Sequence, residues 1–74
     1  MDSMQVMQAV LEHDQKHESR VSLTYLFEKL GCEDTFSQHR LFRTLQRMVE
    51  AGSLCHELVQ GEDYYWINTG PNAA

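Results

Sequence analysis

The chain is short and acidic. Its 74 residues are 42% hydrophobic and 23% charged, which is typical of one globular domain and excludes a large enzyme, a disordered tail and a low-complexity chain. The 6 basic and 11 acidic residues give a net charge of -5, which argues against a nonspecific nucleic-acid coat. Because no apolar stretch approaches the roughly 20 residues of a membrane span and no signal peptide begins the chain, we expect a cytoplasmic protein without membrane contact.

Two apolar stripes predict the first two helices. One helix is expected over residues 3–16, with a single apolar arc: Met4, Val6, Met7, Val10 and Leu11. A polar break follows at residues 17–20, and Ser22 can then cap a second helix. The apolar residues of this helix are spaced i, i+3, i+4 and i+7: Leu23, Leu26, Phe27 and Leu30. Gly31 supplies its C-terminal stop.

A third amphipathic helix is expected to run to Ala51 and to stop at Gly52. A turn over residues 32–36 precedes it. Three residues are candidate N-caps: Asp34, Thr35 and Ser37. At about 100° per residue, its apolar residues share one side of the helix: Leu41, Phe42, Leu45, Met48 and Val49. Three arginines lie on the opposite side: Arg40, Arg43 and Arg47.

The pattern after the third helix is typical of β-strands. Residues 54–59 and 64–67 carry β-branched and aromatic side chains, and the polar segment 60–63 between them contains the glycine of a hairpin loop. The sequence therefore predicts a two-stranded antiparallel hairpin. Residues 1–68 are expected to form the domain, and residues 69–74 a flexible C-terminal tail.

Aromatic side chains are dense in the second strand of this hairpin. Alternation along the strand directs Tyr65 and Ile67 toward the helices, and Tyr64 and Trp66 away from them. The outward pair has two interpretations. It either extends the cover of a small core or, together with the methionines of the first helix, buries against a second copy in a homodimer.

The order of three short helices and a hairpin resembles the winged helix-turn-helix superfamily. The resemblance covers roughly residues 4–68. It rests on residues 26–31 for the end of the second helix, on residues 41–52 for the third, and on a hairpin, called the wing, that returns through residues 65–68. It implies a small α+β fold in which the third helix enters the DNA major groove and the wing touches the neighbouring backbone or minor groove.

The resemblance also implies which residues contact DNA. The matching positions are Ser37, Gln38, His39, Arg40, Arg43, Thr44 and Arg47. Gln38 leans toward the core side of the helix, although from the first turn it can still reach a phosphate or a base. Arg40 and Arg43 are expected to contact bases or phosphates, and Arg47 the DNA backbone.

Charge segregation supports this interpretation independently of the resemblance. Half of the lysine and arginine side chains lie on one stripe of the third helix, and residues 37–49 contain no acid. Arginine donates paired hydrogen bonds to phosphates and to guanine, so the stripe favours DNA binding. The alternative is a solvated face whose arginines pair with Glu50 or with the acids before the helix.

Two features depart from a minimal DNA-binding pattern. The turn over residues 31–37 exceeds the usual three or four residues, and the predicted wing tip carries Glu62 and Asp63, which would repel phosphates. Either the wing is lifted away from DNA or the domain binds something else. The sequence thus predicts a sequence-specific double-stranded DNA-binding protein, a small transcriptional regulator acting as a homodimer. The alternative is a winged-helix protein-interaction module that binds an acidic protein partner and no DNA.

Metal and catalytic sites have little support in the sequence. His13 and His17 are four residues apart, a spacing that can place two imidazoles on one helix face, but no CxxC or HExxH motif accompanies them. Cys32 and Cys55 are interpreted as reduced apolar fillers, without the base and orienting group that a nucleophile requires. We therefore predict no enzyme activity, no metal and no cofactor.

Overall fold

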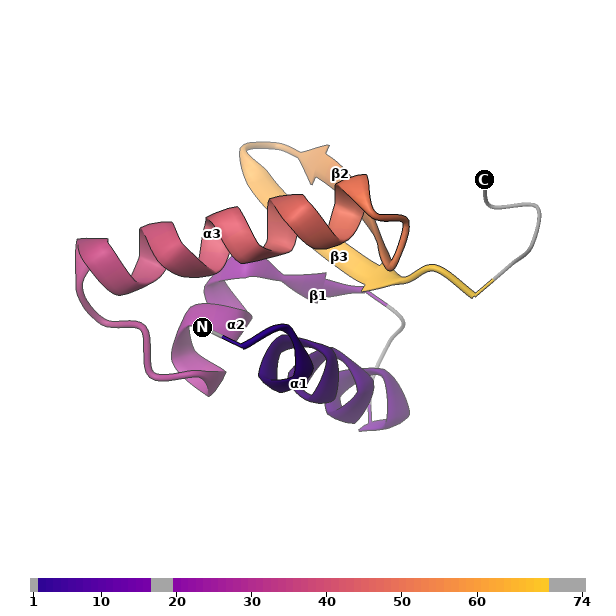
Figure 1. The fold of residues 1–74 in the computed structure, drawn as a ribbon, viewed down its shortest axis with the longest axis horizontal. Helices are drawn as coiled ribbons and strands as arrows, with labels where there is room; N and C mark the ends of the chain where they lie inside the picture. Colours follow the sequence, from indigo (N-terminus) through magenta and orange to yellow (C-terminus); the bar gives the residue numbers. More distant parts are fainter. Residues whose placement is uncertain (1, 17–19, 70–74) are drawn as a thin grey trace.

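The computed structural model describes residues 2–16 and 20–69, and within them three helices pack against a three-stranded antiparallel sheet (Figure 1). The elements in chain order are α1 (Ser3–Lys16), β1 (Val21–Ser22), α2 (Leu23–Lys29), α3 (Thr35–Glu50), β2 (Leu54–Val59) and β3 (Glu62–Ile67). The predicted α+β class is therefore confirmed. In the described part of the chain, no helix is both long enough and apolar enough to cross a membrane.

The helices begin and end where their capping residues predict. The Ser22 hydroxyl accepts a hydrogen bond from the Tyr25 amide at 3.1 Å, which caps α2. Of the three candidate caps of α3, Asp34 occupies the position, and its carboxylate accepts from the Ser37 amide at 3.4 Å. After α2 and α3 the chain turns through Gly31 and Gly52, whose φ angles of 70° and 85° favour glycine.

The sheet differs from the predicted two-stranded hairpin in having a third strand. β1 pairs antiparallel with β3, with Val21 opposite Tyr65 and Ser22 opposite Tyr64, so that the strand order is β1-β3-β2. A strand of two residues has no periodicity of its own. It forms because Val21 reaches the core beside Tyr65, and the local sequence before α2 carries no signal of that distant partner.

The turn between β2 and β3 is also shorter than predicted. It consists of Gln60 and Gly61 alone, whose positive φ angles of 50° and 82° are those of a two-residue hairpin turn. β3 therefore begins at Glu62 rather than Tyr64, and Val59 pairs with Glu62. The prediction that residues 60–63 form the loop is wrong, because the extended pairing continues through two acidic residues that are poor strand formers on propensity alone.

The core lies between the helices and the inner face of the sheet. Its buried members are Val6, Ala9, Val10, Val21, Leu26, Cys32, Leu41, Leu45, Met48, Leu54 and Tyr65. Tyr65 is 2% exposed and Ile67 packs against the same cluster, as alternation predicts. On the outer face, the guanidinium of Arg20 lies 4.5 Å from the ring centroid of Trp66 and pairs with Glu57. Trp66 is therefore partly covered within its own chain.

Candidate nucleic-acid interface

The side of α3 that faces away from the core carries the three predicted arginines. Leu41 and Leu45 are fully buried on the inner side of this helix. At about 100° per residue, that packing leaves Arg40, Arg43 and Arg47 on the opposite side, and all three are exposed. We call these three residues the arginine stripe. The amphipathic pattern of the sequence thus placed them correctly.

None of these arginines forms an ion pair with a carboxylate among the described residues. The ion pairs of this part of the molecule join Arg20 to Glu57, Lys29 to Glu12 and His56 to Asp63. The alternative in which the stripe is neutralised by Glu50 or by the acids before α3 is therefore not what the structure has. The guanidinium groups keep their donors available for a partner, which is the condition for binding phosphate or guanine.

A shallow depression lies within the stripe. It has a volume of about 220 Å³ and is lined by Arg40, Arg43, Thr44 and Arg47. Since a water molecule occupies about 30 Å³ of liquid, this depression has room for a phosphate-sized anion and several waters. Three positive charges around one open depression suit an anion that approaches from solvent.

The other predicted contact residues are placed less uniformly. His39 is exposed on α3, and Ser37 is half-buried in the first turn, where its amide is taken by the N-cap. The Thr44 hydroxyl donates to the Arg40 carbonyl at 3.0 Å and keeps its lone pairs as acceptors. Gln38 donates from Nε2 to the carbonyl of Cys32 at 3.2 Å and is half-buried. Gln38 therefore fastens the turn before α3 and does not lie in the stripe.

Phe36 belongs to the same face of α3 but was not among the predicted contact residues. Its side chain is 69% exposed, and the guanidinium of Arg40 lies 5.8 Å from its ring centroid. The sequence interpretation assigned it to the turn over residues 32–36, whereas α3 begins at Thr35. If Asp34 is taken as the N-cap, Phe36 falls within the helix. The arginines then follow it at i+4, i+7 and i+11, which places Phe36 on the same face of α3.

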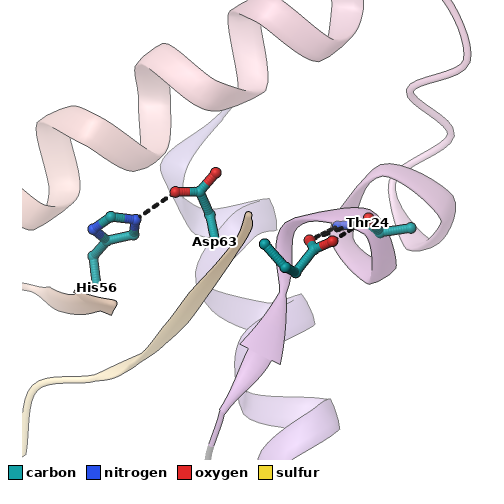
Figure 2. A network of polar contacts seen from close by, with 4 residues as sticks. Thr24, His56 and Asp63 are labelled. Carbon is teal, nitrogen blue, oxygen red and sulfur yellow. Dashed lines mark hydrogen bonds and ion pairs between the residues drawn. The ribbon is translucent and has the colours of Figure 1, made fainter. Parts of the chain in front are cut away.

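The two acids of the wing, Glu62 and Asp63, are engaged within the protein and directly follow the two-residue turn. Figure 2 shows the Asp63 carboxylate directed at the His56 ring, and its Oδ1 lies 2.7 Å from Nε2. The Glu62 carboxylate accepts from the amide of Thr24 at 3.2 Å and from its hydroxyl at 3.1 Å, at the start of α2. The turn is shorter than predicted, so the two acids lie in β3 immediately after the turn and not in the loop itself.

The two turn residues are uncharged, and the two acids flank them on the β3 side, where Glu62 pairs with Val59 and Asp63 with Leu58. Gln60 and Gly61 form the turn, and the two residues before them are apolar and exposed, Leu58 at 62% and Val59 at 39%. The Glu62 charge is hydrogen-bonded without being neutralised, whereas that of Asp63 has an imidazole beside it.

The histidines and cysteines do not assemble a reactive centre among the described residues. No group of three or more His, Cys, Asp or Glu side chains in that part of the chain is arranged to hold a metal ion. His13 packs edge-on to Tyr25, with ring centroids 4.7 Å apart, and His17 lies outside the described residues. Both cysteines are free thiols, and burial raises the pKa of Cys32, which keeps it in the unreactive thiol form.

Comparisons of the chain with protein-family models, with curated proteins and with solved structures find no match. The case for an interface on α3 therefore depends on its geometry and charge. A net charge of -5 is combined with one helix face on which every charged side chain from Ser37 to Val49 is positive. Such a local reversal of charge marks the surface on which an anionic partner is favoured.

Proposed function

We propose that this chain is a winged-helix protein that binds specific sequences of double-stranded DNA and acts as a small transcriptional regulator. The observation that carries the proposal is the arginine stripe, which is exposed, lies opposite the buried side of α3 and has no carboxylate partner within residues 2–16 and 20–69. A major groove about 12 Å wide admits one helix, so an exposed helix face of this kind can present its side chains to base edges.

Each arginine has a role that follows from its place along α3. In helices that insert into the major groove, the N-terminal residues contact base edges, while the rest of the helix approaches the backbone. Arg40 and Arg43 therefore suit guanine or phosphate contacts, and Arg47, three turns into the helix, suits a phosphate.

A homodimer is part of this proposal. Three arginines give one copy few phosphate contacts, and two copies would double them. Met4 and Leu11 are seven residues apart on α1, which places them on one side of that helix, and they are 75% and 46% exposed. This apolar side of α1 is the surface that we assign to the contact between copies.

A second candidate function is favoured by the acidic surface and by Glu62, whose charge has no cationic partner among its hydrogen bonds. In that case the arginine stripe would bind an acidic protein. The two functions can be distinguished by experiment, because only the first requires that the arginine stripe bind duplex DNA without another protein.

The test is selection of binding sites from random duplex DNA at low salt, followed by affinity measurements. The wild-type protein should enrich a common sequence, and the Arg40→Ala/Arg43→Ala double variant should lose about 1–3 kcal/mol for each arginine that contacts a base. Lys29→Ala is the matched control, because it removes one positive charge that already pairs with Glu12 on another helix. Failure of the wild-type protein to bind any duplex, with co-purification of an acidic protein, would establish the second candidate instead.

A further inference from the structure

Phe36 is an apolar side chain placed among cations. It lies in the first turn of α3, is 69% exposed, and shares the outward side of the helix with the arginine stripe. The guanidinium of Arg40 is 5.8 Å from its ring centroid, close enough for a cation–π contact that orients both groups. An isolated exposed apolar residue needs no explanation, but this one stands at the end of α3 that would enter the groove most deeply.

The chemistry of Phe36 restricts what it can recognise in the major groove. A phenyl ring neither donates nor accepts the hydrogen bonds that distinguish most base edges. The apolar group that the groove exposes is the 5-methyl group of thymine, and phenylalanine is one of the side chains that contact it. A wedge between stacked bases is the other use of such a ring, but it is typical of proteins in the minor groove.

We propose that Phe36 is a specificity-determining residue that contacts a thymine methyl group, next to the base pair that Arg40 contacts. This inference depends on the proposed DNA-binding function and adds to it the chemical identity of one recognised base. Because the Arg40 guanidinium lies 5.8 Å from the Phe36 ring centroid, we expect their two contacts to fall on the same or adjacent base pairs. The recognised sequence therefore contains a thymine at a fixed place beside the position read by Arg40.

The test uses the duplex selected by the wild-type protein, with each thymine replaced in turn by deoxyuridine. This replacement removes only the methyl group and leaves base pairing and hydrogen bonding unchanged. Replacement of one thymine in each half-site should lower the wild-type affinity by about fourfold. This is the change expected when one methyl group is lost from an apolar contact. Phe36→Ala should bind the thymine duplex more weakly and should no longer distinguish thymine from uracil at that place.

Arg43→Gln is the matched control, since it lies on the same face of α3 and should weaken binding while keeping the difference between thymine and uracil. Circular dichroism would verify that Phe36→Ala is folded, as expected for so exposed a side chain. If the wild-type protein binds but no uracil replacement matters, or if Phe36→Ala keeps the same preference, the role of Phe36 is wrong and DNA binding stands. If the wild-type protein binds no duplex at all, both proposals fail together.

Discussion

The salt dependence of DNA binding offers the most quantitative test of the arginine stripe. Each phosphate contact by a cation releases condensed counterions, and log K then falls against log salt with a slope of about 0.9 per contact. If Arg40, Arg43 and Arg47 all contact phosphates, they contribute a slope of about 2.7 per copy, or roughly a 40-fold change in affinity between about 50 and 200 mM salt. A variant with all three changed to glutamine should lose that contribution.

The assay is fluorescence anisotropy of a labelled duplex over a series of salt concentrations. The single variants separate the two kinds of contact. Replacing an arginine that contacts a phosphate reduces the slope, whereas replacing one that contacts a base lowers the affinity at every salt concentration. Lys29→Gln removes the same charge from α2, where Nζ lies 3.0 Å from Glu12, and should leave the slope unchanged. The reasoning is refuted if the triple variant keeps the wild-type slope, or if Lys29→Gln flattens it equally.

Three further predictions concern the scaffold that holds the stripe. Leu45→Ala should lower the free energy of unfolding by about 2–5 kcal/mol in chemical denaturation, because Leu45 is fully buried, and a smaller loss would mean that the core can collapse around the gap. The exposed pair of Arg20 and Glu57 should show a coupling of about 0.2–1 kcal/mol in a double-mutant cycle, and a larger value would contradict its solvent screening. Burial raises the pKa of Tyr65 to about 12 from an ordinary 10.0, so its contribution to stability should be complete below pH 10 and should be lost as the pH rises toward 12. Denaturation midpoints should show a shallower decline over this range in Tyr65→Phe than in the wild-type protein, and equal declines would contradict the shift.

The helices could be predicted because their signals are local. Each apolar stripe repeats within a few residues, and each end is marked by a side chain that completes the backbone hydrogen bonds, such as Ser22 and Asp34. The two-residue strand β1 could not be predicted in this way. Its existence depends on the pairing of Val21 with Tyr65, from which it is separated in the sequence by α2, α3 and β2.

The parts of the candidate site that depend on helical periodicity could be predicted from the sequence. The parts that depend on where a helix or strand begins could not. The outward placement of the stripe follows from the burial of Leu45 on the other side of α3. The sequence does not predict Phe36 as a contact residue, because the predicted turn extends through residue 36. It predicts Gln38 as a contact residue, although the Gln38 side-chain amide donates to the turn before α3. The sequence predicts Glu62 in the hairpin loop because acids are rare in strands. In the structure Glu62 begins β3, and its carboxylate accepts hydrogen bonds from Thr24.

The number of arginines bears on how the protein would occupy its site. Contacts to 6–10 phosphates underlie the steep salt dependence of well-studied DNA-binding proteins. One copy of this chain offers three arginines on α3 that pair with no carboxylate of the described residues. Two copies supply six such side chains, which reaches the lower end of that range. The proposed homodimer therefore predicts that the selected sequence contains two half-sites, because a single copy has too few arginines on α3 for steep salt dependence.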